Sequence, residues 1–323
     1  MSMYEAIKNF AKQFEYEPKI ENEKSLRKYD KFIVAGMGGS NLIAGLLKIR
    51  NPGLEIIEHR NYDLPNIPKN QLKETLIIAN SYSGNTEETI STFLKAVKEK
   101  LPIAAVSTGG KLMDLARKHK KPYIHMPNFN LQPRSATGLN IKAILKIMGD
   151  RNGLRETLEL ANSLRPYQQE RDGKALAKKL KGHVPVIYSS QKNFPIAYNW
   201  KIKFNETGKI PAFINNFPEL NHNEMTGFDT QDTTRDLSKN FFFLFLKDSS
   251  DNLKILKRMN VTERLYRERG FPVEVIILNG KTPFQKIFSS LIFADWTAYY
   301  IATEYKVEAE QVPMVEEFKK LIK

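Results

Sequence analysis

The chain of 323 residues contains no cysteine. This absence excludes a disulfide framework, zinc sites built from thiolates and a cysteine nucleophile. The sequence also lacks any apolar run that approaches the roughly 18 residues of a membrane span, and its first residues contain no apolar signal core. No spacing among its five histidines resembles a zinc motif such as His-Glu-x-x-His. We therefore expect a soluble cytoplasmic protein with no membrane partner and no metal ion.

Positive charge is abundant, with a formal net charge of +14 and a pI near 9.6. The lysines and arginines are interspersed with glutamates along expected helices, as in residues 95–100 and 258–267. No arginine-rich run and no basic stripe with interleaved aromatic residues is present. This pattern favours a general attraction to anionic small molecules over dedicated nucleic-acid binding.

One stretch, Thr75 to Thr89, carries the strongest local signal. Its first five residues are an apolar, β-branched run typical of a buried strand, and helical spacing of apolar residues begins after Thr86. The hydroxyls of Ser81, Ser83 and Thr86 would then lie beside the unpaired N–H groups of a helix start, which is a place that attracts phosphate. An ordinary capping box, with Asn85 as N-cap and Glu88 three residues on, remains an alternative.

A second turn of the same kind lies upstream, at Gly36-Met-Gly-Gly-Ser40. It follows an expected strand at residues 31–35 and precedes an expected helix at residues 41–48. Glycines allow a backbone to approach a ligand closely, although a simple tight turn would also use them. Because parallel strands end at one edge of a sheet, the two turns together predict two sides of one anion site.

Strands alternate with helices along the whole chain, which predicts an α/β fold with parallel sheets flanked by helices. We expect two doubly wound domains, residues 1–150 and residues 151–323. A leading helix is expected within residues 1–30 and a lysine-rich helix within residues 306–323. The expected strands comprise residues 31–35, 55–58, 75–79, 101–106, 123–125, 184–189, 241–246 and 273–278.

The two glycine- and serine-rich turns resemble the sugar isomerase (SIS) domain, in which hydroxyls and backbone amides hold a sugar phosphate. Three later stretches narrow the resemblance to the bifunctional phosphoglucose/phosphomannose isomerase family. They are Gln132-Pro-Arg-Ser-Ala-Thr-Gly138, Lys203-Phe-Asn-Glu-Thr-Gly-Lys-Ile-Pro211 and Pro218-Glu-Leu-Asn-His-Asn-Glu224. The resemblance runs from about residue 31 to the C-terminus.

This resemblance implies a homodimeric aldose–ketose isomerase that acts on sugar 6-phosphates without a metal or other cofactor. By this resemblance, Arg134 of this chain would steady the enediolate and Glu206 would move the proton between C2 and C1. His222 would open the sugar ring from the other subunit, and Lys319 would be the C-terminal active-site lysine, although Lys320 is adjacent. The phosphate would be held by Gly38, Gly39, Ser40, Ser81, Ser83 and Thr86.

One departure from the family pattern concerns the segment before the last helix. Where the family has Asp-Pro-Thr-Pro, this chain has Glu310-Gln-Val-Pro313. In the family the threonine is associated with use of either sugar epimer. Val312 keeps the shape of the threonine and loses its hydroxyl. We expect this change to affect the use of mannose 6-phosphate as a substrate more than the use of glucose 6-phosphate.

The residues by themselves leave alternatives open. Glu206 alone could be a solvated carboxylate, His222 a loop histidine bonded to backbone, Arg134 a salt-bridged arginine and Lys319 a surface lysine. A non-catalytic sugar-phosphate-binding regulator of the same fold is the alternative function. It would keep the phosphate turns but would have no need of Glu206 or His222, and an aminosugar isomerase or lyase fits the turns but not the later motifs.

Overall fold

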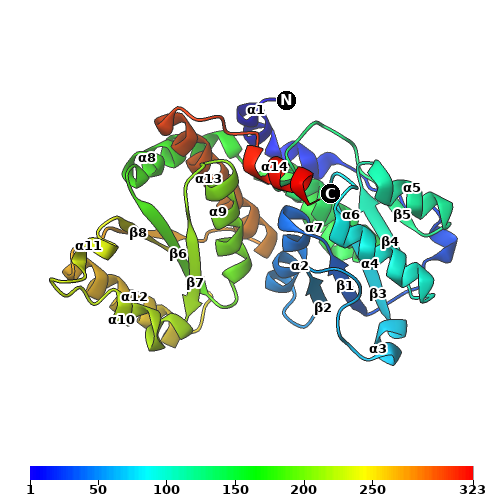
Figure 1. Cartoon of the computed structure of the whole chain (residues 1–323), viewed down its shortest axis with the longest axis horizontal. Helices are drawn as coiled ribbons and strands as arrows, with labels where there is room; N and C mark the ends of the chain where they lie inside the picture. The colour runs from blue at the N-terminus through cyan, green and yellow to red at the C-terminus, as the bar shows by residue number, and fades with distance from the viewer. Residues whose placement is uncertain (323) are drawn as a thin grey trace. The chain divides into compact units, whose positions relative to one another are not determined.

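A computed structural model describes residues 1–322 and divides the chain into two compact units. The first unit consists of Met1, Lys8–Leu164 and Thr282–Phe284. The second consists of Ser2–Ile7, Arg165–Lys281 and the described residues from Gln285 onward. Each unit is an α/β fold with one fully parallel sheet (Figure 1).

The sheet of the first unit has the strand order β2-β1-β3-β4-β5. Its strands are β1 (Lys31–Ala35), β2 (Glu55–His59), β3 (Thr75–Asn80), β4 (Ile103–Ser107) and β5 (Tyr123–His125). Its helices are α2 (Gly38–Arg50), α3 (Lys69–Glu74), α4 (Glu87–Lys98), α5 (Gly110–Lys118), α6 (Thr137–Met148) and α7 (Arg151–Ser163). Short 3₁₀ turns are η1 (Phe10–Glu15), η2 (Glu23–Ser25) and η3 (Pro133–Ser135).

Both faces of this sheet are covered because alternate strand residues point to opposite sides. The odd-numbered residues of β1, β3 and β4, such as Ile33, Ile77 and Ile103, pack with the apolar stripes of α4 and α5. The α2 and α6 helices contact each other and are apolar around most of their surface, which is why nearly all of their residues are buried. The expected doubly wound arrangement is therefore confirmed for this unit.

The second unit has a sheet of order β7-β6-β8-β9. Its strands are β6 (Val184–Ser190), β7 (Phe213–Phe217), β8 (Phe241–Lys247) and β9 (Val273–Ile277). Its helices are α1 (Met3–Lys8, largely in this unit), α8 (Glu170–Leu180), α9 (Phe194–Glu206), α10 (Glu224–Gly227), α11 (Arg235–Ser238), α12 (Leu253–Glu268), α13 (Pro283–Tyr305) and α14 (Pro313–Leu321). Its 3₁₀ turns are η4 (Pro166–Gln169) and η5 (Glu219–His222).

Aromatic side chains build much of the second core. Phe243 and Phe245 of β8 pack with Tyr188 of β6, Phe217 of β7 and Tyr266 of α12 on one face of the sheet. On the helical layer formed by α9 and α13, the indole of Trp200 donates to Ser290 Oγ at 3.0 Å. The expectation that the aromatic run at residues 241–245 is a core strand is confirmed.

Two features differ from the expected pattern. The leading segment is not one long helix, because α1 ends at Lys8 and a 3₁₀ turn, η1, follows from Phe10. Strand β7 was not predicted, because it is a short edge strand with two asparagines and little burial until Phe217. Both are segments whose local pattern is weak and whose structure depends on packing.

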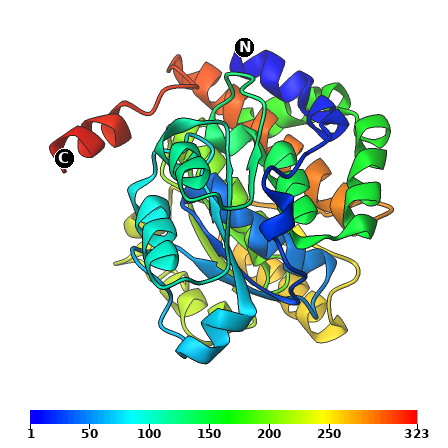
Figure 2. The ribbon, with the colours of Figure 1, turned by 90° about the vertical axis from the view of Figure 1, so that its right-hand side faces the viewer.

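The last helix, α14, has an apolar face that its own unit leaves uncovered. Figure 2 shows it in red, joined to α13 by an extended segment and clear of the other helices of its unit. Its apolar residues are all exposed, namely Met314, Val315, Phe318 and Leu321. Within residues 1–322 no helix combines the length and apolar character needed to cross a membrane.

The turn after β3 depends on a glycine for two reasons, and a matched pair of substitutions separates them. Gly84 and Gly149 have nearly the same positive φ, 72° and 73°. A Cβ on Gly84 would lie 1.8 Å from the carbonyl oxygen of Gly109, whereas one on Gly149 would meet nothing within 4 Å. We expect Gly149→Ala to lower the free energy of unfolding by about 1–2 kcal/mol, the cost of a left-handed Cβ.

Gly84→Ala should cost about 1–3 kcal/mol more, because backbone must also move to relieve the overlap. Urea unfolding followed by circular dichroism measures both values. Equal losses for the two variants would contradict the steric part of this explanation.

Candidate active site

The two glycine- and serine-rich turns meet at the carboxyl edge of the first sheet. Strands β1 and β3 are paired so that Ala35 lies opposite Ala79. The turns that follow the two strands therefore begin at the same edge of the sheet. The side-chain amide of Asn80 donates to the backbone oxygen of Ser40 at 2.7 Å, and the Tyr82 amide donates to Ser40 Oγ at 3.3 Å. The predicted proximity of the two turns is therefore present in the first unit.

Hydroxyl groups gather within the second of these turns. Ser81 Oγ and Thr86 Oγ1 are 2.8 Å apart, and Ser81 Oγ also accepts from the Gly84 amide at 3.1 Å. Ser83 is exposed, and its Oγ accepts from the Asn85 amide at 3.3 Å. The N-cap of α4 is Thr86 without a side-chain cap bond, so the capping box headed by Asn85 does not form.

The start of α2 is the better of the two helix ends for an anion. Its N-cap is Met37, which offers no side-chain cap bond, and Gly38 has a φ of 51°. The first amides of the helix therefore have no side-chain acceptor from the cap, as an anion site requires. By contrast, the first turn of α4 already carries Glu87 and Glu88, which would repel a phosphate.

Arg134 lies against the first turn. The η3 turn passes so close to Gly39 that a Cβ there would be 3.1 Å from Arg134 Cα. The side chain is 3% exposed, and its Nη1 donates to Gln132 Oε1 at 3.5 Å. The backbone of Arg134 thus lies beside Gly39, and a buried guanidinium carried by this turn is suited to supply positive charge to an anionic ligand.

Gln13 is a residue of this region that the sequence did not suggest. Its amide nitrogen donates to the backbone oxygen of Ser135 at 2.8 Å, and its Oε1 accepts from the Gly138 amide at 3.1 Å. The side chain is buried and comes from the η1 turn, more than 120 residues away in sequence. It holds the backbone that carries Arg134, and no local motif could have indicated this contact.

In the second unit, Glu206 is the last residue of α9 and is partly buried. Three residues earlier on the helix, Lys203 forms a buried ion pair with Asp295 of α13, with Nζ 2.5 Å from Oδ1. The ammonium of Lys209 donates to the backbone oxygen of Glu206 at 2.6 Å and to that of Gln311. Lys209 thus links the end of α9 to the segment that leads to α14.

His222 ends the η5 turn and is exposed. Because β6 and β7 are parallel, α9 must finish at the amino edge of the sheet, whereas η5 begins at the carboxyl edge. The five residues of β7 separate the two positions, and such a strand spans about 16 Å. Glu206 and His222 of one unit therefore lie at opposite edges of its sheet and are not brought together.

The C-terminal candidates lie on α14. Lys319 and Lys320 are both exposed, and the ammonium of Lys319 is 2.7 Å from Glu316 Oε1. Val312 is the N-cap of the helix and is partly exposed. Exposure does not distinguish between the two lysines.

The carboxyl edge of the second sheet carries acids where the first carries hydroxyls. Asp248, directly after β8, is fully buried and lies 2.7 Å from the ammonium of Lys286 and 3.4 Å from that of Lys192. Burial alone would raise the pKa of Asp248, but hydrogen bonds from Lys286 and Ser250 and the charge of Lys192 hold it well below its usual range. This carboxylate occupies the switch point of the second sheet, so the edge offers no comparable phosphate site.

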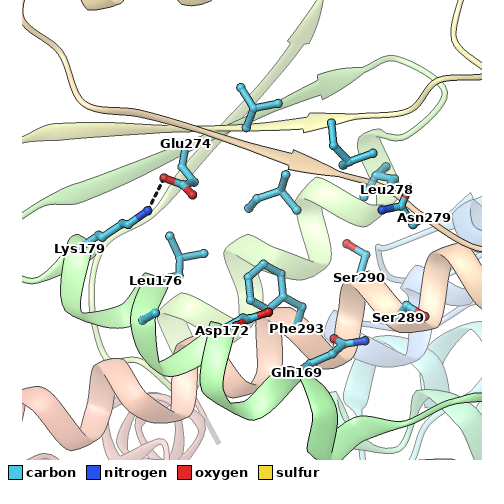
Figure 3. A pocket seen from close by; sticks show the side chains of 14 residues that line it. Gln169, Asp172, Leu176, Lys179, Glu274, Leu278, Asn279, Ser289, Ser290 and Phe293 are labelled. Carbon is cyan, nitrogen blue, oxygen red and sulfur yellow. Dashed lines mark hydrogen bonds and ion pairs between the residues drawn. The ribbon is translucent and has the colours of Figure 1, made fainter.

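The second unit also has a pocket of about 520 Å³ between α8, β9 and α13 (Figure 3). Its lining includes the apolar residues Leu176, Leu278 and Phe293, and the Lys179–Glu274 ion pair of 2.9 Å lies at its side. None of the candidate site residues lines it. Across residues 1–322, His, Asp and Glu side chains form no group of three that could hold a metal ion.

Comparison with known proteins gives consistent matches. Residues 169–322 match the model of the bacterial phospho-glucose isomerase C-terminal SIS domain. The chain is 32% identical over 94% of its length to a bifunctional phosphoglucose/phosphomannose isomerase of Thermoplasma volcanium, of which 95% is covered. A protein of the same name from Aquifex aeolicus is 28% identical over 99% of this chain and 98% of its own length.

Among solved structures, the C-terminal domain of glucosamine-fructose-6-phosphate aminotransferase from Francisella tularensis matches with a TM-score of 0.69. It is 14% identical and covers 96% of each chain, so this likeness concerns the fold alone.

The buried Lys203–Asp295 pair should be important for stability near Glu206. Substitution Lys203→Met leaves the Asp295 carboxylate buried without its cation, and we expect a loss of about 3–5 kcal/mol in the free energy of unfolding. A double variant, Lys203→Met with Asp295→Leu, should recover most of that loss because neither charge of the pair then remains. Urea denaturation of the two variants checks this, and a double variant as unstable as Lys203→Met would contradict it.

Proposed function

Because the chain belongs to the bifunctional phosphoglucose/phosphomannose isomerase family, we propose that it interconverts glucose 6-phosphate, and also mannose 6-phosphate, with fructose 6-phosphate. The single observation that carries this proposal beyond the family relationship is the gathering of Ser40, Ser81 and Thr86 at one sheet edge. The chain is thus related to these isomerases over nearly its whole length, and its first sheet has an edge suited to a phosphate. A pure regulator would need such an edge as well, so the catalytic residues decide between the two.

The reaction begins with ring opening. An acid donates a proton to the ring oxygen O5 as the C1–O5 bond breaks, and the O1 hydroxyl loses a proton as the C1 carbonyl forms. An imidazole is suited to this exchange because its ordinary pKa lies near neutrality. We assign this step to His222.

The second step moves hydrogen between two carbons. A carboxylate removes the proton from C2 while O1 gains one, which gives the enediol. The same group then delivers a proton to C1 while O2 loses one, and the C2 ketone is formed. We assign this role to Glu206, with Arg134 stabilising negative charge on the enediolate oxygens.

The enediol has no configuration at C2, and therefore glucose and mannose 6-phosphate lead to the same intermediate. The phosphate turns keep the sugar still while the proton moves, which lowers the entropic part of the barrier. No step calls on a metal ion.

We propose a homodimer, and the positions of two residues in the second unit support it. Glu206 and His222 of one chain lie at opposite edges of a sheet, too far apart to reach one sugar. We therefore propose that His222 acts on a sugar held by a second copy of the chain. The exposure of His222 is compatible with such a role.

The test is the initial rate of fructose 6-phosphate formation from each aldose in the presence of EDTA. We expect the unsubstituted protein to turn over and Glu206→Gln to lose about 10²–10⁴-fold in turnover, because the amide cannot accept the proton. Binding of fructose 6-phosphate, measured by calorimetry, should persist in that variant. Glu268→Gln, on the exposed face of α12, is the matched control and should turn over normally.

Ligand binding without turnover by the unsubstituted protein would favour the non-catalytic regulator. Normal turnover by Glu206→Gln would remove Glu206 from the proposed role.

Epimer preference provides a second prediction. Val312→Thr restores a hydroxyl at the start of α14, and we expect it to raise the ratio of mannose 6-phosphate to glucose 6-phosphate turnover several-fold. Val315→Thr makes the same chemical change one turn along the exposed helix and should leave the ratio unchanged. The two ratios, measured as kcat/KM, check this, and an equal change in both variants would dissociate Val312 from specificity.

A further inference from the structure

The four residues Asn221-His222-Asn223-Glu224 form a turn. The side chains of its two asparagines and its glutamate make hydrogen bonds, and that of His222 is exposed to solvent. Asn221 Nδ2 donates to Thr262 Oγ1 on α12 at 2.8 Å. Asn223 Nδ2 donates to Glu219 Oε1 at 2.8 Å, and its Oδ1 accepts from the Glu224 amide at 2.5 Å. His222 is exposed, and its imidazole takes no part in these bonds.

Glu224 connects this turn to the sheet. Its Oε1 accepts from the hydroxyl of Tyr188 on β6, and its Oε2 accepts from the side-chain amide of Asn215 on β7. Tyr188 and Asn215 are direct neighbours across the two parallel strands, so their side chains lie on the same face of the sheet. One carboxylate therefore bridges two adjacent strands.

The tyrosine beneath this carboxylate belongs to a buried aromatic cluster. Tyr188 is fully buried among Phe217, Phe243 and Phe245, and its hydroxyl is 3.5 Å from that of Tyr266. Burial, followed by the proximity of Tyr266 and Glu224, raises the pKa of Tyr188 well above its usual range, so the phenol keeps its proton and remains a donor. Both oxygens of Glu224 thus have permanent partners.

We propose that Glu224 is a positioning residue for ring opening: anchored by Tyr188 and Asn215, it fixes the turn from which the His222 imidazole projects. This inference rests on the proposed function and assigns a role to a residue beyond those of the proposed site. A proton donor must lie within about 3 Å of the atom it protonates, and a displacement of 1 Å can cost about 10²-fold in rate. An exposed histidine on an unanchored turn would seldom meet that requirement.

The competing explanation is that Glu224 only satisfies two polar groups at the edge of an aromatic core. In that case its loss would lower stability and affect every catalytic step alike. Positioning predicts instead a defect confined to ring opening. The two explanations are separated by a measurement of ring opening alone.

Exchange between the α and β anomers of glucose 6-phosphate provides that measurement, because it requires ring opening but no transfer of the C2 proton. In protein that carries Glu206→Gln, two-dimensional NMR exchange spectroscopy reports it without interference from isomerisation. Adding Glu224→Gln should slow enzyme-catalysed anomer exchange about 10–100-fold, towards the rate with His222→Ala. The combined His222→Ala/Glu224→Gln protein should be no slower than His222→Ala alone.

Control variants make the result independent of folding. Glu268→Gln makes the same substitution on an exposed helix face and should leave exchange unchanged. Should Glu224→Gln fail to fold, Tyr188→Phe removes one of the two donors, keeps the ring in the core and should give a smaller loss of the same kind. Near-ultraviolet circular dichroism confirms that the compared variants share the native aromatic packing.

Two results would overturn the inference: anomer exchange at the original rate in Glu224→Gln, or an equal further loss when Glu224→Gln is added to His222→Ala. Both are distinct from failure of the proposed function, which would appear as absence of isomerisation in the unsubstituted protein.

Discussion

The parallel pairing of strands is the constraint on which the rest of this structure depends. Parallel strands leave the sheet at one edge, so turns that are far apart in sequence are brought side by side without any direct local signal. In the first unit the pairing of Ala35 with Ala79 brings the turn after β1 beside the turn after β3. In the second unit the same rule separates Glu206 from His222, because Glu206 ends the helix before β7 and His222 comes after that strand.

Two of the candidate residues share a second property, which is that neighbouring groups hold the backbone that carries them. Near Glu206, the Lys203–Asp295 ion pair and the Lys209 hydrogen bond hold the end of the helix. Near Arg134, the Gln13 side chain bonds to the following backbone. Such support from neighbouring groups narrows the range of positions open to a functional side chain.

The two units differ at equivalent places. The first unit has hydroxyls and a helix start without a side-chain cap at its switch point, which suit an external anion. The second has Asp248 between two lysines, so that its anion is a built-in carboxylate. The same sheet architecture thus forms an open binding edge in one unit and a closed structural network in the other.

The sequence by itself determined the succession of strands and helices, the buried aromatic strand at residues 241–245 and the motifs of the family. These features are carried by residues close together in the chain, where hydrophobic periodicity, glycine turns and short motifs are informative. The proximity of the two phosphate turns was also predictable, because it follows from parallel pairing alone.

Only the tertiary structure decided which distant residues support the site. The bonds from Gln13 to the Arg134 turn, from Lys203 to Asp295 and from Tyr188 to Glu224 join residues 36 to 122 positions apart, and none has a local signature. Strand β7 likewise pairs with a neighbouring strand that supplies its hydrogen bonds, although two asparagines weaken its own preference for a strand. A pattern in sequence reports the preference of a segment, whereas packing selects the partners that the segment finally meets.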